Sequence, residues 1–195
     1  MDKKQKIIAA ALEEFQANGV EKTKVSDIVK RAGVAQGTFY LYFPSKLALM
    51  PELARIMVGK TLERIEQDVT KKEDFHSKLH QLIESTFSLT KEYRGIFAII
   101  YTGLAASDYL QQWELIYEPY YEWMTAFLEQ ADKQGTIRLP LPATRFAKLA
   151  IGLIESAAEQ TYLYDSGSQQ EACKTIADTY AFLTRALCAD KPASF

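Results

Sequence analysis

The sequence predicts an all-α protein with a three-helix head, residues 1–61, and a six-helix body, residues 62–195. Three observations lead to this prediction. Apolar residues recur every three to four positions along most of the 195 residues, which is the spacing of amphipathic helices. No segment alternates apolar and polar side chains as a half-buried strand does. Glycine, proline and short polar segments separate the helical stretches, and there is no internal repeat or low-complexity tract.

The head contains two short helices separated by a tight turn. An apolar stripe around Ile28 ends at Gly33, where a left-handed cap is easiest for glycine. The next short helix stops before Pro44, because proline cannot continue a helix. Residues 3–17 carry a further apolar stripe and would form a helix that braces this pair. The arrangement is that of a helix-turn-helix, which predicts DNA binding.

The aromatic residues of the second short helix fall on two sides. Phe39 and Phe43 lie one turn apart and are expected to pack inward. Tyr40 and Tyr42 lie on another side, and a wholly buried short helix would not favour two hydroxyl groups. The alternative is that all four rings belong to a small core. Gly37 favours the DNA-binding interpretation, since a residue without a side chain lets the backbone approach a sugar-phosphate wall closely.

Residues 1–61 resemble the DNA-binding domain of the TetR family of bacterial transcriptional regulators. The matching positions are Ile28, Ala32, Gly33, Val34, Gly37, Tyr40, Tyr42, Phe43, Lys46 and Leu49. The residues that the resemblance places against phosphates are Tyr40, Tyr42 and Lys46. Those that it places at base edges or their neighbouring backbone are Gln36, Gly37 and Thr38. Those that it places at the flanking DNA backbone are Lys24 and Ser26.

The charge distribution agrees with a DNA-binding head. The whole chain has a net charge of −2 and a pI near 5.8, which does not by itself indicate a nucleic-acid partner. Residues 1–60, however, contain ten Lys and Arg against six Asp and Glu, whereas residues 61–195 contain thirteen against nineteen. A basic head on an acidic body fits a protein that binds DNA through its head.

The sequence also predicts a cytoplasmic protein with no membrane partner. It starts with a polar segment, shows no secretory signal, and has no apolar run of the roughly 18–20 residues that a membrane span needs. Cys173 and Cys188 lie fifteen residues apart on one expected helix and cannot easily meet within one chain. Reduced cysteines are typical of the cytoplasm.

The body is expected to be helical throughout. A long helix over residues 45–68, capped by Ser45, would connect it to the head. The further helices are expected over residues 75–92, 95–107, 108–135, 142–165 and 169–188. Pro119 interrupts one of them and is expected to kink it. Three helices followed by six is also the TetR-family architecture, so the resemblance extends through the body, where it rests on pattern alone.

Aromatic residues gather in the body on the expected helix 108–135 and the helix before it. Their spacing places several on one continuous face. One interpretation is a bulky hydrophobic core, and the other is a small-molecule pocket lined by aromatic faces. Glu155 and Glu159 lie one turn apart on a mostly apolar helix, where unpaired acids are costly to bury. They either follow a solvated stripe or pair with Lys148 or with another helix, or they lie at the floor of the pocket and bind a cation or a hydrogen-bond donor.

The pocket interpretation predicts a small, partly aromatic or cationic organic effector. The candidate effector-binding residues are Phe97, Tyr101, Trp113, Tyr117, Tyr120, Glu155, Glu159 and Tyr162. The last two expected helices carry more apolar surface than one core needs, and family members pair these helices with their copies. The candidate homodimer residues are Leu149, Leu153, Ala157, Thr179, Tyr180, Leu183 and Leu187.

Other functional classes fit the sequence less well. No nucleophile elbow, zinc-protease, P-loop or dinucleotide-binding motif is present, which argues against an enzyme. His76 and His80 have the spacing of a metal pair, but one pair does not complete a site, so no metal or cofactor is expected. A purely structural helical adaptor would not require the motif from Gly37 to Lys46. The sequence therefore predicts a transcriptional regulator, by family default a repressor, that binds a palindromic operator as a homodimer and is released by a small effector.

Overall fold

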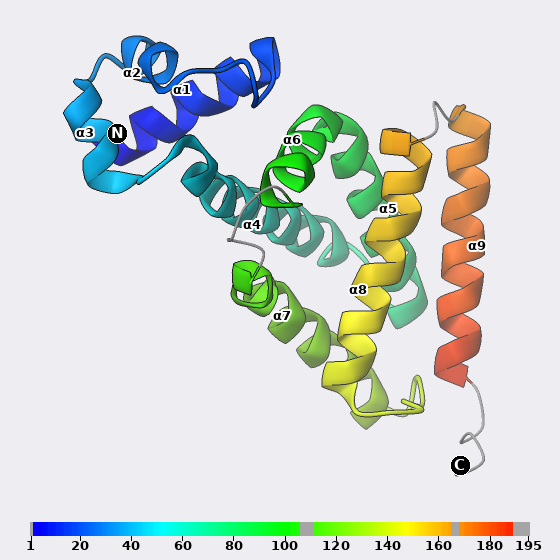
Figure 1. Cartoon of the computed structure of the whole chain (residues 1–195). Helices are drawn as coiled ribbons and strands as arrows, with labels where there is room; N and C mark the ends of the chain where they lie inside the picture. Colours follow the sequence, from blue (N-terminus) through cyan, green and yellow to red (C-terminus); the bar gives the residue numbers. More distant parts are fainter. Residues whose placement is uncertain (1, 106–110, 165–167, 189–195) are drawn as a thin grey trace. The chain divides into compact units, whose positions relative to one another are not determined.

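The computed structural model describes residues 2–105, 111–164 and 168–188, and in these ranges it contains only helices and the loops that join them (Figure 1). The helices are α1 (Lys3–Asn18), α2 (Val25–Ala32), α3 (Gln36–Tyr42), α4 (Met50–Val69), α5 (Phe75–Glu92), α6 (Arg94–Ala105), α7 (Trp113–Lys133), α8 (Ala143–Glu159) and α9 (Gln169–Cys188). The predicted all-α class is confirmed. The helix start expected at residue 108 and the breaks at residues 107–108 and 165–167 lie outside the described residues.

The chain divides into two compact units. The first consists of Met1–Val58 and Gly95–Tyr117, and the second of Gly59–Arg94 and Glu118–Phe195. Both α4 and α7 continue from one unit into the other. The first unit therefore combines α1, α2 and α3 with α6, which lies far away along the chain.

The core of the first unit is built where α1, α2 and α3 meet. Ile7, Ile28 and Phe39, one from each helix, have no exposed surface. Phe43 is also buried, and its ring centroid lies 5.6 Å from that of Phe39. The inward packing predicted for these two phenylalanines is confirmed. Gly33 ends α2 with a φ of 64°, the left-handed conformation that its position predicted.

Helix α6 packs closely against the start of α4 in the same unit. A methyl group added at Gly103 would lie 2.5 Å from the Met50 sulfur atom, closer than van der Waals contact allows. Met50 is fully buried, so its side chain has little space to move away. Glycine at this position therefore permits the close approach of the two helices.

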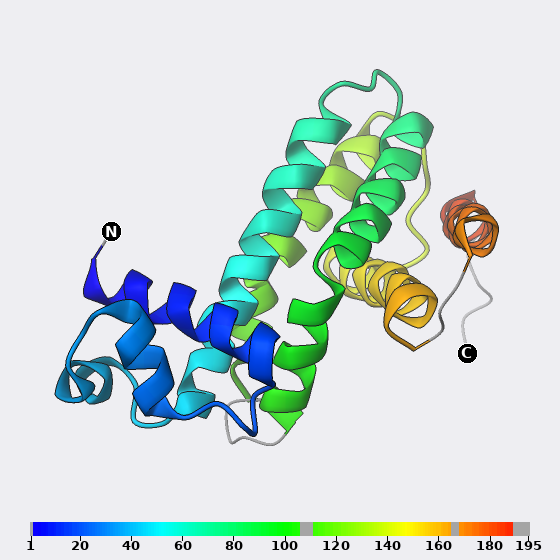
Figure 2. The same cartoon turned by 90° about the horizontal axis from the view of Figure 1, so that it is seen from above.

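The second unit is a helical layer in which α5 packs against α8 and α9. Its buried side chains include Leu82 of α5, Ile151 of α8 and Leu187 of α9. Helices α8 and α9 lie side by side and run in opposite directions, and Figure 2 shows α9 end-on beside α8. The Arg138 N–H donates to the Leu187 carbonyl at 3.0 Å, which attaches the loop before α8 to the end of α9. No helix among the described residues is long and apolar enough to cross a membrane.

Candidate DNA-binding surface and effector site

Helix α3 directs three consecutive large side chains outward. Tyr40, Leu41 and Tyr42 are 51%, 83% and 45% exposed. Gln36 and Gly37, at the start of the helix, are exposed as well, and Thr38 is half-buried. The sequence analysis placed all of these except Leu41 on the DNA surface. Leu41 could have been found from sequence, since three consecutive helical residues cannot all face the core.

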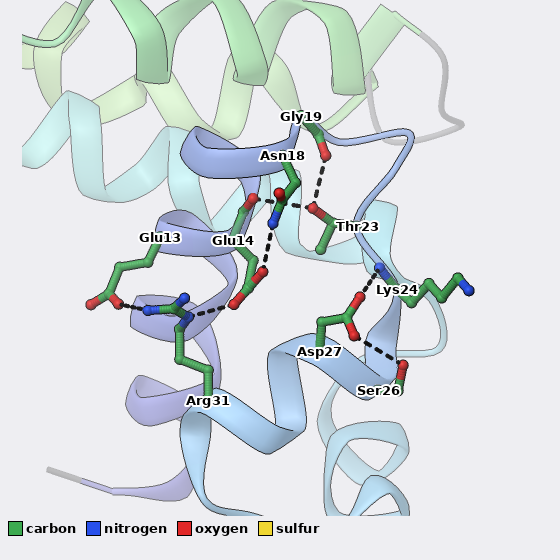
Figure 3. A network of polar contacts seen from close by, with 9 residues as sticks. All are labelled: Glu13, Glu14, Asn18, Gly19, Thr23, Lys24, Ser26, Asp27 and Arg31. Carbon is green, nitrogen blue, oxygen red and sulfur yellow. Dashed lines mark hydrogen bonds and ion pairs between the residues drawn. The ribbon is translucent and has the colours of Figure 1, made fainter.

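A buried carboxylate holds α2 against α1 (Figure 3). Glu14 accepts hydrogen bonds from Arg31 Nε at 2.5 Å and from Asn18 Nδ2 at 2.9 Å. Arg31 also donates from Nη1 to Glu13 at 2.8 Å. These two carboxylates, Glu14 first, raise the pKa of the Arg31 guanidinium above its ordinary value. The buried apolar residues set the angle between α1 and α2, and this polar network helps to hold it.

The loop between α1 and α2 leads to two further candidate DNA contacts. Thr23 is buried, and its hydroxyl group donates to the Gly19 carbonyl at 2.8 Å. The Asp27 carboxylate accepts from the Lys24 N–H at 3.1 Å and so caps the start of α2. Ser26 and Lys24 are exposed at this helix start, and the Lys24 side chain extends away from the network in Figure 3.

Lys46 differs from the other candidate DNA contacts in where its charge lies. Its ammonium donates to the carbonyls of Val20, Glu21 and Thr23 at 2.6, 2.9 and 2.9 Å. The resemblance assigned this side chain to a phosphate. In the structure it is directed into the protein, and all three of its donors are used there.

The candidate effector residues of the first unit form a continuous aromatic row. Ring centroids are 6.3 Å apart between Phe97 and Tyr101, 6.0 Å between Tyr101 and Trp113, and 4.6 Å between Trp113 and Tyr117. Tyr117 is buried and the other three are half-buried. Helix α6 and the start of α7 thus bring together four residues that the sequence had placed on neighbouring helices.

The remaining candidate effector residues belong to the second unit. Tyr120 of α7 is fully buried, and among the described residues its hydroxyl group has no hydrogen-bond partner. Its pKa is raised, first by burial and then by the negative charge of Glu155, while the nearby Thr86 side chain lowers it. Glu155 and Glu159 of α8 are half-buried. Tyr162 packs edge-on against Phe87, with the two ring centroids 6.2 Å apart.

The apolar stripe of α9 is used within the chain itself. Thr179, Leu183 and Leu187 are only 6%, 3% and 1% exposed. These three residues were predicted to form the homodimer surface, and in the single chain they lie beneath α5 and α8. An amphipathic helix has one main apolar face, and on α9 that face packs against α5 and α8. Side chains already buried in a single chain have almost no surface left for a partner.

Other apolar residues remain exposed on the same two helices. Leu149 of α8 and Phe182 of α9 are 66% and 64% exposed. Leu149 lies six residues after the start of α8, and Phe182 lies six residues before the end of α9. Leu153, Ala157 and Tyr180, the other predicted interface residues not yet placed, are half-buried.

In the described ranges no three His, Cys, Asp or Glu side chains are arranged to hold a metal ion.

Two family models match successive parts of the chain. The model described as "Bacterial regulatory proteins, tetR family" matches residues 7–53, which include the helix-turn-helix. The model described as "Tetracyclin repressor-like, C-terminal domain" matches residues 79–187, more than half of the chain. The chain belongs to the TetR family. It is accordingly a DNA-binding regulator of transcription and not an enzyme.

Several members of the family are similar over nearly the whole chain. The uncharacterized HTH-type transcriptional regulator YvdT of Bacillus subtilis is 37% identical over 186 residues, 95% of each protein. The fatty acid metabolism regulator protein of B. subtilis is 29% identical over 84% of this chain and 85% of its own. Among solved structures, the transcriptional regulator FadR of B. subtilis, in complex with stearoyl-CoA, is 26% identical with a TM-score of 0.74, covering 93% of this chain and 98% of that one.

Proposed function

We propose that this TetR-family regulator is a cytoplasmic repressor that binds a palindromic operator as a homodimer and is released by a fatty acyl-CoA thioester. The observation that carries the proposal is the outward face of α3, whose exposed residues lie where the family reads DNA. The effector class is suggested by two relatives of similar length, one named for fatty acid metabolism and one solved with stearoyl-CoA.

The size of the recognition element supports a dimer. Helix α3 has only seven residues, so one copy can contact few base pairs. A two-fold dimer presents two such helices to two half-sites, which are then separated by about one turn of DNA, roughly 34–36 Å. The surface that we assign to the dimer contact is centred on Leu149 and Phe182, the exposed apolar residues of α8 and α9.

Replacing Gln36 by alanine is expected to change which operator sequences are preferred. Gln36 is exposed at the start of α3, and a bidentate contact from its amide to a base contributes about 1–3 kcal/mol of discrimination. Selection from a random duplex pool, carried out in parallel with Gln36→Ala and the parent protein, would measure this. Recovery of the same sequences with the same relative affinities would show that Gln36 makes no base contact.

The aromatic row of the first unit provides apolar surface that an acyl chain can cover. Each methylene group buried there adds about 0.8 kcal/mol, so stearoyl-CoA is expected to bind more tightly than lauroyl-CoA. The effector can release DNA only if it binds the DNA-incompetent conformation more tightly. The operator must then weaken acyl-CoA binding by the same factor.

The aromatic or cationic effector that the sequence favoured is the second candidate, because half-buried Glu155 and Glu159 could bind a cation.

Stearoyl-CoA is expected to weaken operator binding by about 5–150-fold, the usual range of such coupling. Fluorescence anisotropy of a labelled operator would measure the release.

The two tryptophans of the chain report where the effector binds. Trp113→Phe should abolish an effector-induced change in tryptophan fluorescence. Trp123→Phe should retain it, because Trp123 stacks on Phe127 in the second unit. Binding of stearoyl-CoA that is equally tight with and without operator would refute the proposed release.

A further inference from the structure

The loop between α1 and α2 has an unusual attachment. This loop, residues 19–24, contains three carbonyl groups that converge on the Lys46 ammonium, with N–O distances of 2.6 to 2.9 Å. Lys46 lies at the start of the 3₁₀ turn Lys46–Leu49, immediately before α4, and its side chain is half-buried. One side chain thus connects the loop to the segment that follows α3.

The ammonium group has no donor left for another partner. A lysine side chain has three N–H donors and no acceptor, and each donor here has one carbonyl. Lys46 is also absent from the ion pairs found in the described part of the chain, so backbone carbonyl dipoles balance its charge. A contact with a DNA phosphate would require at least one of the three bonds to break.

The other side of the loop is not held by close packing. Residues Asn18 to Lys22 border an apolar groove of about 320 Å³, whose opposite wall is formed by Ala98, Ile99 and Thr102 of α6. A further restraint on the loop is the Thr23 hydroxyl, which lies 2.8 Å from the Gly19 carbonyl within the loop and 3.2 Å from the Glu14 carbonyl of α1. Thr23 thus ties the loop to α1, whereas Lys46 attaches it through three hydrogen bonds to the segment that follows α3.

We propose that Lys46 is a positioning residue and not a phosphate ligand: it clamps the α1–α2 loop and so presets the start of α2 for DNA. The residues that it positions are Lys24, which follows Thr23 directly, and Ser26, two positions further on; both are exposed at the start of α2. Without the clamp the loop can still reach its bound conformation on DNA. The affinity then falls by the cost of ordering the loop, roughly tenfold for each residue that becomes ordered.

The clamp and the phosphate contact predict different salt dependences. A side chain that neutralises a phosphate contributes about 0.9 to the slope of log affinity against log salt concentration. Lys46→Met should lower affinity by about tenfold or more at every salt concentration and leave this slope unchanged, because the complex contains the same phosphate contacts. Lys24→Met is the matched control, and it should reduce the slope by about 0.9. The probe is a duplex recovered with the parent protein by selection from a random pool.

Arginine at position 46 separates the two roles further. A guanidinium group binds phosphate at least as well as an ammonium group, so a phosphate contact would be restored by Lys46→Arg. Its planar fork cannot donate to three carbonyls that converge on one nitrogen atom, so a clamp would not be restored. We expect Lys46→Arg to bind as weakly as Lys46→Met. Binding by Lys46→Arg at the level of the parent, together with a reduced slope in Lys46→Met, would overturn the proposal.

Hydrogen exchange tests the clamp in the parent protein itself. In the free parent protein the amides of Thr23 and Lys24, which donate to the Gly19 carbonyl and the Asp27 carboxylate, should already be protected, and this protection should persist when the duplex is bound. A loss of loop protection on DNA would mean that Lys46 leaves the carbonyls for a phosphate, and it would refute the clamp. Lys46→Met without DNA should exchange faster in the loop, whereas Lys24→Met should match the parent.

Discussion

Replacing Leu149 by glutamate is expected to produce a folded monomer whose operator affinity is lower by about 10²–10⁴-fold, the usual contribution of a second linked binding site. Leu149 is 66% exposed in the single chain, so a carboxylate there remains in water until two chains associate. In the dimer the same carboxylate would be buried without a partner, which is strongly unfavourable. Sedimentation velocity would measure the assembly and fluorescence anisotropy the DNA affinity.

Two further glutamate variants define what this result means. Leu115 is also 66% exposed but lies on α7, so Leu115→Glu should remain a dimer with normal affinity. Leu183 is 3% exposed, so Leu183→Glu would place a charge in the core of its own chain and reduce helicity measured by circular dichroism. A Leu149→Glu protein that still sediments as a dimer would place the interface on another surface.

Replacing Phe39 by alanine is expected to unfold the helix-turn-helix region and abolish DNA binding. Phe39 is completely buried between α1, α2 and α3, and its ring packs against Tyr40 and Phe43 at centroid distances of 5.4 and 5.6 Å. Removal of a buried phenylalanine ring costs about 3–5 kcal/mol, a large part of the stability of a small core. Thermal denaturation followed by circular dichroism would show the loss as a lower or separate first transition.

The adjacent residue provides the control for this experiment. Tyr40 is 51% exposed, so Tyr40→Ala should change the free energy of unfolding little while weakening DNA binding. The pair therefore separates a residue that holds the fold from one that faces the DNA. Equal thermal stability of Phe39→Ala and the parent would contradict the assigned core.

The residues of α9 show what helical periodicity in a sequence can predict and what it cannot. Thr179, Leu183 and Leu187 recur at helical spacing, and the prediction that they share one face is compatible with their common burial. The periodicity does not state what covers that face. That face is covered by α5 and α8 of the same chain, and the large apolar side chain that stays exposed on the described part of α9 is Phe182, which does not belong to the stripe.

Lys46 shows the same limit for a polar side chain. Its position in the family motif indicated a cation at the start of a helix, and a phosphate was the partner expected there. The carbonyl groups that accept its hydrogen bonds belong to residues 20, 21 and 23, more than twenty positions earlier in the chain. No pattern of neighbouring residues predicts a contact between residues so far apart in the sequence, since the loop and the helix meet only through the packing of α1, α2 and α3.

The sequence by itself determined the all-α class, the helix-turn-helix and the family, because these depend on signals read over a few neighbouring residues. Apolar spacing set the helices, and Gly33 and Pro44 marked ends that any chain with those residues would favour. The tertiary structure alone decided which apolar face each helix keeps for its own core, which aromatic rings meet, and what a long cationic side chain binds. These outcomes depend on competition between partners that lie far apart along the chain, and only the folded arrangement brings those partners within contact distance.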